Sequence, residues 1–283
     1  MKRIFCAGLF FLATHPAFAF DLSVVSYNVE SDNDTDPAKV IQDIERISAS
    51  HIWGLVEVDT ADLEAYRAAV GQNFVLIAGN TGLSTSRPDD RLAIIFDPDV
   101  LEQIGQEEEL SAAGGSRHPL LAKFKVTATG DEFWFVVNHL QRGREETRQA
   151  QADWLNEWAQ NRADNVNPPA IILVGDYNFD VTPYTMRGNA GFEIFMEDGM
   201  FRWVVPPCIP DDSCPLTGTG CHPHFNSILD FVFLAGPARH WSANSEILFQ
   251  NESDYCDNER LTVGGQMVPG GADHRPVRAI LTF

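Results

Sequence analysis

A short apolar segment followed by polar residues constrains the fold of this chain more than any other feature. Five apolar residues, Ala170 to Val174, follow the breaker pair Pro168-Pro169, which is the composition and length of a buried β-strand. We expect this strand to end at Gly175 and to place Asp176 and Asn178 at its carboxyl end, where open α/β sheets bind ligands. In an extended chain, residues two positions apart point to the same side, so the carboxylate and the amide can act together. The alternative is an ordinary Asp/Asn turn behind a strand.

Strand and helix patterns alternate along the rest of the chain. Strands are expected at residues 22–27, 51–56, 74–78, 91–96, 120–127, 132–138, 200–205, 228–234, 246–249 and 277–283. Helices are expected from Asp36-Pro37 onward and at residues 61–70, 145–160 and 190–197. Polar loops are expected at 79–90, 206–225 and 251–271. The alternation predicts an α/β protein with one domain over residues 20–283, without internal repeats.

The first nineteen residues have the pattern of a secretory signal peptide. Lys2 and Arg3 precede an apolar run at residues 4–13, and Ala17-Phe18-Ala19 forms an A-x-A cleavage site. The run is too short to span a bilayer, and no later stretch is expected to do so. The sequence therefore predicts a soluble, secreted or periplasmic protein that is cleaved after Ala19.

The chain is strongly acidic. Its formal charge is −20, and removal of the two positive charges of Lys2 and Arg3 with the leader takes −20 to −22. Such a surface repels polyanions at long range, which argues against a passive nucleic-acid binder with a basic contact surface. It does not exclude an enzyme that meets phosphate through a bound cation.

Four cysteines remain after the leader is removed: Cys208, Cys214, Cys221 and Cys256. An even number in an exported chain predicts two disulfides. Of the three possible pairings, we favour 208–214 with 221–256. The segment Cys221-His222-Pro223-His224 offers zinc binding as an alternative, but its spacing fits no structural zinc pattern.

Polar groups suited to a metal ion and a phosphate follow, precede or interrupt several other strands. They are Asn28, Glu30, Glu57, His139, Asp230, Asp273 and His274. Hard cations require oxygen ligands, and phosphoryl transfer requires positioned groups that stabilise charge. Each of these residues alone has an ordinary structural explanation; Asp230, for example, would be a buried carboxylate with a partner. Their joint placement favours a catalytic site.

Six short motifs that contain these residues occur in order along the chain. They are Ser-Tyr-Asn-Val-Glu at 26–30, Gly-Leu-Val-Glu-Val at 54–58, Asn-His-Leu at 138–140, Gly-Asp-Tyr-Asn at 175–178, Leu-Asp-Phe-Val-Phe at 229–233 and Asp-His-Arg-Pro at 273–276. Together they resemble the endonuclease/exonuclease/phosphatase family, which includes DNase I, apurinic endonucleases, sphingomyelinases and inositol polyphosphate 5-phosphatases. The resemblance spans nearly the whole mature chain. It implies a DNase I-like four-layer α/β sandwich, with two mixed, mainly antiparallel β-sheets packed face to face and helices outside.

The resemblance also implies a metal site. Glu57 looks like the principal ligand of Mg²⁺, with Mn²⁺ or Ca²⁺ as alternatives. Asn28 would lie beside the metal and the phosphate, and Asp273 would lie near the metal. Glu30 is additional to the family's nuclease pattern; it would be either a second metal ligand or an ordinary loop carboxylate.

The catalytic roles follow from the same motifs. Asp176 would orient or deprotonate the attacking water, and Asn178 would hold a phosphate oxygen. His274 would contact the scissile phosphate, and Asp230 would fix its tautomer and raise its basicity. His139 would serve as an acid or a phosphate ligand. The reaction would be in-line attack by water on a phosphoester, without a covalent intermediate.

Two positions depart from the family pattern. Many relatives have Gln before the metal-binding Glu, whereas this chain has Val56, so one hydrogen bond beside Glu57 is expected to be missing. The sequence also reveals no acidic partner for His139.

Two arginines flank Gly143 close to His139. Arg142 and Arg144 are expected to bind substrate, because arginine side chains bind phosphate oxygens with two hydrogen bonds. The alternative is a helix start with salt bridges to the adjacent residues Glu145 and Glu146.

The sequence thus predicts an exported Mg²⁺-dependent phosphoester hydrolase. The favoured activity is a phosphodiesterase or nuclease that acts on nucleic acid. The alternative is a phosphatase or phospholipase-C-type hydrolase of a small or lipid phosphoester, such as an inositol phosphate or sphingomyelin. The long loops carry few adjacent aromatic residues, which argues against a lipid substrate. A non-catalytic binding member is the least favoured interpretation. No protein partner is predicted.

Overall fold

The structure of the protein is a computed structural model. It describes residues 19–30, 35–47, 50–111, 115–183, 185–209, 218–221, 227–252, 255, 260–263 and 266–283. Residues 1–18 and 222–226, with Cys214 and Cys256, lie outside the described residues, so the signal peptide, the cysteine pairing and the zinc alternative stay predictions. Cys208 and Cys221 are in the disulfide-bonded form. Among the described residues, none of the helices is long and apolar enough to cross a membrane.

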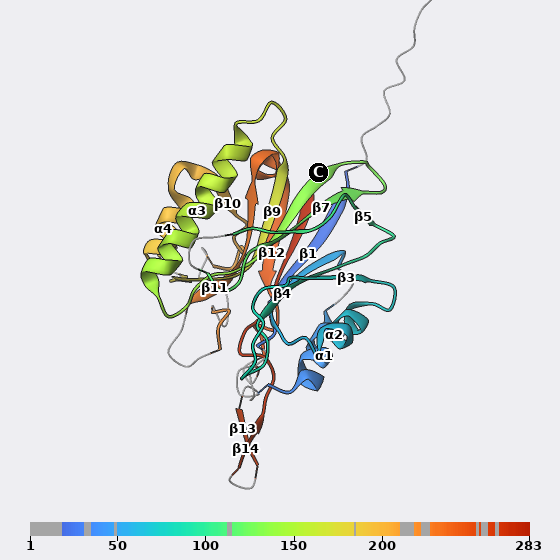
Figure 1. The fold of residues 1–283 in the computed structure, drawn as a ribbon, viewed down its shortest axis with the longest axis vertical. Coiled ribbons are helices and arrows are strands. Elements are labelled where there is room, and N and C mark those ends of the chain that lie inside the picture. The colour runs from blue at the N-terminus through green and yellow to red at the C-terminus, as the bar shows by residue number, and fades with distance from the viewer. Residues whose placement is uncertain are drawn as a thin grey trace, which may run out of the picture.

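Two β-sheets make up the centre of the fold (Figure 1). The first has six strands in the order β12-β15-β1-β2-β4-β3, and the second has seven in the order β10-β11-β9-β8-β7-β5, with β6 paired to β7. The strands of the first are β1 (Asp21–Asn28), β2 (Ile52–Val58), β3 (Val75–Ala78), β4 (Arg91–Phe96), β12 (Ser242–Ile247) and β15 (Val277–Thr282). Those of the second are β5 (Leu101–Gln103), β6 (Glu108–Glu109), β7 (Leu120–Val126), β8 (Glu132–His139), β9 (Ala170–Val181), β10 (Phe201–Trp203) and β11 (Ile228–Ala235).

Each sheet contains one parallel strand pair, β1–β2 in the first and β8–β9 in the second. The other pairings in the two sheets are antiparallel. A helix connects the strands of each parallel pair, as parallel strands require. The predicted mixed, mainly antiparallel sheets are confirmed.

Helices cover the outer face of each sheet (Figure 1). The helices on the first sheet are α1 (Pro37–Arg46) and α2 (Leu63–Val70); those on the second are α3 (Glu145–Ala163) and α4 (Ala190–Met196). The predicted start of α1 is confirmed, because the Asp36 side chain accepts a hydrogen bond from the backbone N–H of Ala38. The described residues also include two 3₁₀ helices, Glu197–Gly199 and Gly236–His240. The arrangement is the predicted four-layer sandwich.

Alternation along the strands divides the apolar side chains between two clusters. In β1, Val25 and Tyr27 pack beneath α1 and α2, whereas Val24 packs between the sheets. In β2, Gly54 faces the second sheet, where Val174 of β9 and Val137 of β8 lie opposite it. A Cβ atom added there would lie 2.3 Å from Cγ2 of Val174 in β9, so the sheets could not pack this closely around a larger residue.

The strand that contains Asp176 is longer than predicted. The prediction that it ends at Gly175 was wrong, since β9 continues to Val181, which pairs with Ile228 of β11. Gly175 has φ +132°, and a Cβ atom there would lie 1.9 Å from the carbonyl oxygen of Asn138. Glycine therefore permits a distorted strand to continue, where the sequence suggested a stop.

Other differences concern polar strands. The predicted strand at 246–249 lies instead at Ser242–Ile247, where exposed polar residues alternate with less exposed ones and the strand pairs with β15 at the sheet edge. Strands β5 and β6 were not predicted, nor was the hairpin of β13 (Arg260–Val263) and β14 (Gln266–Pro269), which projects at the bottom of Figure 1. These short strands are stabilised by backbone pairing and lack an apolar alternation that sequence could reveal.

Candidate active site

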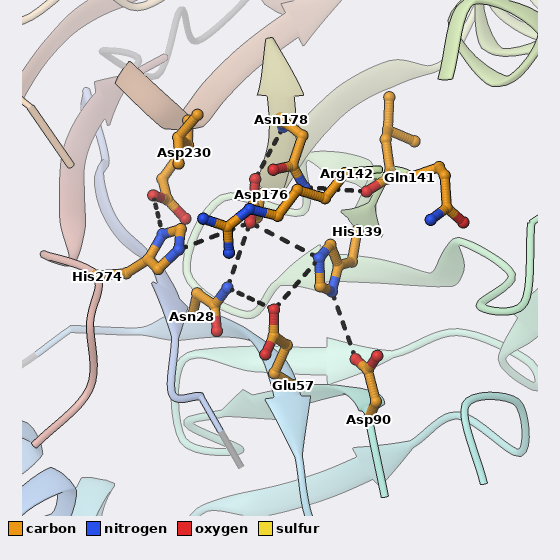
Figure 2. Close-up of polar contacts among 12 residues, drawn as sticks. Asn28, Glu57, Asp90, His139, Gln141, Arg142, Asp176, Asn178, Asp230 and His274 are labelled. Atoms are coloured by element: carbon orange, nitrogen blue, oxygen red, sulfur yellow. Dashed lines mark hydrogen bonds and ion pairs between the residues drawn. The ribbon is translucent and has the colours of Figure 1, made fainter. Parts of the chain in front are cut away.

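The two parallel pairs place four polar side chains together (Figure 2). Asn28 ends β1 and Glu57 lies near the end of β2, whereas His139 ends β8 and Asp176 lies beside it in β9. Parallel strands have their carboxyl ends at one edge of a sheet, so each sheet contributes two side chains to the same place. The expectation that strand ends converge is therefore what the structure shows for these four residues.

Asn28 connects the two sheets. Its amide Nδ2 donates to Oε1 of Glu57 at 3.0 Å and to Oδ2 of Asp176 at 3.3 Å. Its Oδ1 accepts the backbone N–H of Glu30 at 3.0 Å. Asn28 therefore holds the carboxylates of Glu57 and Asp176 together, while its side-chain oxygen fixes the backbone at Glu30.

His139 contacts carboxylates through both ring nitrogens. Its Nε2 lies 3.4 Å from Oε1 of Glu57 and 3.7 Å from Oδ2 of Asp176. Its Nδ1 lies 3.4 Å from Oδ1 of Asp90, which also forms an ion pair with Arg117. Burial raises the pKa of Asp90, but the neighbouring His139 and Arg117 outweigh it and hold that pKa below its usual range. Asp90 is the acidic partner of His139 that the sequence did not reveal.

His274 is buried among carboxylates. Its Nδ1 lies 2.7 Å from Oδ2 of Asp230, and its Nε2 lies 3.4 Å from Oδ1 of Asp273 and 3.9 Å from Oδ2 of Asp176. Burial lowers the pKa of His274, but the charges of Asp230, Asp273 and Asp176 raise it well above the usual value. The predicted contact between Asp230 and His274 is present in the structure.

Thr219, which the sequence did not single out, positions that pair. Asp230 follows an irregular step in the pairing of β11 with β9, and the Thr219 hydroxyl accepts the backbone N–H groups of Leu229 at 2.9 Å and Asp230 at 3.1 Å. The Thr219 carbonyl accepts the N–H of Arg275 at 2.7 Å. Thr219 is fully buried and thus joins the strand of Asp230 to the segment of His274.

Asn178 and Glu30 are both fixed by backbone contacts. The N–H of Asn178 donates to Oδ1 of Asp176 at 2.8 Å, and its side-chain Nδ2 donates to the carbonyl of Leu140 at 3.0 Å. Oε2 of Glu30 accepts the N–H of Asp273 at 2.7 Å, which ties the end of β1 to the loop before β15. This contact favours the interpretation of Glu30 as a loop carboxylate.

Three site residues have left-handed backbone conformations. Glu30, Glu57 and Asn178 have φ values of 46°, 56° and 50°. These conformations are uncommon for residues other than glycine and cost roughly 1–3 kcal/mol each, so the surrounding fold must hold them in place. Such strain is typical of functional sites.

The nearby arginines differ in position. Arg142 is exposed, and its side chain extends toward the centre of the site in Figure 2. Arg144 is also exposed, at the start of α3, and does not line the pocket beside His139. Arg148 is buried and donates to the carbonyl groups of Gln141 and Arg142, so it supports the loop.

The donor set fits a hard divalent cation. Ligand atoms of Glu57, His139 and Asp176 lie within 4.8 Å of one another. Burial raises the pKa values of both Glu57 and Asp176, because removing a carboxylate from water disfavours its charged form. A cation between these oxygens would stabilise the charged carboxylates.

The family follows from a comparison with known proteins. Residues 25–254 match the model of the Endonuclease/Exonuclease/phosphatase family. The chain belongs to this family. Its members are phosphoester hydrolases that generally depend on divalent metals, and the protein is therefore assigned as a hydrolase. The comparison with curated proteins finds no match.

Solved structures share the fold of this chain. A family protein from Bacteroides thetaiotaomicron is 19% identical with a TM-score of 0.68, covering 94% of this chain and 96% of its own. A mannosyl-6-phosphatase from the same organism is 20% identical with a TM-score of 0.67, covering 93% and 100%. The human Nocturnin catalytic domain with bound sulfate is 14% identical with a TM-score of 0.64, covering 92% and 94%. At these identities the likeness establishes the fold alone.

Proposed function

We propose that the protein is an exported, Mg²⁺-dependent phosphoester hydrolase that uses water as its nucleophile. The observation that carries this proposal is a pair of carboxylates from different sheets, Glu57 and Asp176, that Asn28 joins. Two histidines flank this pair, and each contacts a further aspartate. The site thus combines oxygen ligands for a metal, a carboxylate that can direct water, and two histidines that can donate protons or contact phosphate, and this combination can support phosphoester hydrolysis.

The proposed metal ligands are led by Glu57, with Asp273 nearby. Bound Mg²⁺, or Mn²⁺ or Ca²⁺, would offset negative charge on the phosphate oxygens and stabilise the transition state. Asn28 supports this site by fixing the carboxylate of Glu57. Glu30 supports it by holding the backbone of Asp273.

The remaining residues act on water and phosphate. Asp176 orients or deprotonates the attacking water, and Asn178 holds a phosphate oxygen. His274 contacts the phosphate as an imidazolium, since the carboxylate of Asp230 stabilises its charged form. His139 donates a proton to the leaving group or binds a phosphate oxygen. Attack is in line with the leaving oxygen, without a covalent intermediate.

Two substrate classes are compatible with this chemistry. A nucleic-acid phosphodiester is the activity that the sequence favours, with Arg142 and Arg144 as phosphate contacts. A compact phosphoester is favoured by the pocket beside His139, whose volume is about 220 Å³ and which leaves room for a small group. The formal charge of −20 also disfavours a long polyanion.

A substrate panel tests the proposal. The purified mature protein would be assayed with Mg²⁺, Mn²⁺ or Ca²⁺ on plasmid DNA, RNA, bis-p-nitrophenyl phosphate, inositol phosphates and sphingomyelin. We expect hydrolysis that a chelator abolishes and Mg²⁺ restores. Turnover that persists without divalent metal would contradict the mechanism. Intact-mass measurement of the exported protein, with and without reductant, tests cleavage after Ala19 and the two predicted disulfides.

A further inference from the structure

A pocket of about 220 Å³ opens directly beside the site. Glu57 and His139 form one part of its wall, and the rest comes from three other segments of the chain. These contribute Arg87 to Asp90, Ser116 with Arg117, and Gln141 with Arg142. A phosphate held at Glu57 and His139 would therefore have part of its substrate inside this pocket.

The pocket is rich in arginine, although the protein as a whole is acidic. Arg87, Arg117 and Arg142 all line it, in a chain with a formal charge of −20. The same wall contains three carboxylates, those of Glu57, Asp89 and Asp90, so the arginines provide a site for an anion only where they are not paired with these carboxylates. Clefts concentrate the field of the charges that line them, which strengthens the effect of an unpaired arginine.

The two aspartates of the pocket wall are already engaged by other groups. Asp89 accepts hydrogen bonds from the backbone N–H of Ser84 at 2.7 Å and from the hydroxyl of Thr60. Asp90 contacts His139 and forms the ion pair with Arg117. Asp90 and Arg117 therefore offset each other's charge, whereas Asp89 keeps its negative charge and is held by donors within its own part of the chain. The two remaining arginines of the lining are Arg87 and Arg142.

Arg87 is held by its backbone and not by its side chain. The N–H of Arg87 donates to the hydroxyl of Ser84 at 3.3 Å, and the N–H of Asp89 donates to Asp59 at 3.0 Å, so the loop is anchored on both sides. Across the described residues, the guanidinium group of Arg87 makes no hydrogen bond or ion pair, and the residue is exposed. Within the described residues, the guanidinium group of Arg87 is therefore available at the pocket to donate two hydrogen bonds to a bound anion.

We propose that this pocket binds a second anionic group of the substrate. The preferred substrate is then a compact phosphoester that carries a second phosphate, with the guanidinium group of Arg87 binding that phosphate through two hydrogen bonds. The pocket, with a volume of about 220 Å³, offers room for a compact group. This inference rests on the proposed phosphoester hydrolysis and specifies its substrate class.

The test compares one-phosphate and two-phosphate compounds as inhibitors of bis-p-nitrophenyl phosphate hydrolysis. The pairs are fructose 6-phosphate with fructose 1,6-bisphosphate, and a nucleoside 5′-monophosphate with its 3′,5′-bisphosphate, at fixed free Mg²⁺. We expect each bisphosphate to inhibit at a concentration at least about tenfold lower than its monophosphate, since a charged hydrogen bond contributes roughly 1.5–3 kcal/mol. Arg87→Ala should reduce this ratio to about one, and Arg87→Lys should leave an intermediate ratio. The matched control is Lys125→Ala, which removes one positive charge from β7, outside the pocket, and should keep the wild-type ratio.

The possible results separate this inference from the proposed function. Absence of metal-dependent hydrolysis by the wild-type protein would refute the proposed function and this inference with it. Normal hydrolysis with equal inhibition by both members of each pair would refute the second anionic subsite alone. An Arg87→Ala effect confined to a single-stranded oligonucleotide would overturn the compact substrate class. If Arg87→Ala weakened inhibition by every compound to the same extent, the inference would also be contradicted, because the result would indicate a general change in the loop.

Discussion

The contact between His274 and Asp230 predicts how activity depends on pH. If His274 acts as an imidazolium, activity persists below its folded pKa and falls as pH rises through that pKa. Asp230→Asn removes the carboxylate that lies 2.7 Å from Nδ1 while preserving the size of the side chain. The charged form of His274 then loses its nearest partner, so its pKa falls and the alkaline decline in activity should begin at lower pH.

The size of this shift follows from the geometry. Two unit charges about 4 Å apart interact by about 4 kcal/mol at an effective dielectric constant near 20, and one pKa unit corresponds to about 1.4 kcal/mol. Asp273 and Asp176 remain at 3.4 Å and 3.9 Å from Nε2, so part of the pKa elevation is retained. We therefore expect the decline to move down by about 1–3 pH units.

The assay is kcat/KM against pH with bis-p-nitrophenyl phosphate at saturating Mg²⁺, since this parameter reports groups of the free enzyme. The metal is bound in both proteins, so its own effect on His274 largely cancels in the difference. Asp131→Asn provides the matched control, because Asp131 is an exposed residue at the β7–β8 turn. An unchanged decline in Asp230→Asn, or one displaced to higher pH, would refute the assignment of His274 as an Asp-stabilised cation.

Three further perturbations address the metal, the support of the site and the packing of the sheets. Glu57→Gln and His274→Ala should each lower kcat/KM at least about a hundredfold with an unchanged circular dichroism spectrum, because each removes a charge from the site; near-normal kinetics would remove that residue from the mechanism. Thr219→Val should lower kcat at least about tenfold and Thr219→Ser should restore it, since only the hydroxyl accepts the N–H groups of Leu229 and Asp230; equal activity of both variants would contradict a positioning role. Gly54→Ala should destabilise the fold by about 1–3 kcal/mol, or roughly 2–12 °C in Tm, because its Cβ would lie 2.3 Å from Val174 and 2.9 Å from Val137. Gly143→Ala, whose Cβ would contact nothing within 4 Å, should leave Tm unchanged in the same thermal melt.

Four of the site residues that the sequence predicted share one local property. Asn28, Glu57 and His139 stand at or near the carboxyl ends of their strands, and Asp176 stands where the parallel pairing of β9 with β8 ends. That position can be read from an apolar run followed by a polar residue. The division of strand side chains between the two apolar clusters, one between the sheets and one beneath the helices, also depends on local sequence. These features were predictable because they depend on a few neighbouring residues and on strand periodicity.

Asp90 could not be recognised in this way, because it precedes its strand. Strand β4 runs antiparallel to β2, and Arg91 pairs with Val58, so the amino end of β4 lies beside Glu57. Only the pairing of β2 with β4 therefore brings Asp90 to His139. Thr219 was missed for a related reason. It lies in a loop whose sequence has no periodic pattern, and its contacts are with Asp230 and Arg275, which lie further along the chain.

The division of the site between two sheets makes its geometry depend on their packing. Asn28 and Glu57 belong to one sheet and His139 and Asp176 to the other, and the hydrogen bond from Asn28 to Asp176 crosses between them. Gly54, three residues before Glu57, lies opposite Val174, two residues before Asp176. A displacement of about 1 Å at a reacting group can lower a rate by about a hundredfold. We therefore expect close packing around Gly54 to control the distance between the site residues of the two sheets as well as the stability of the core.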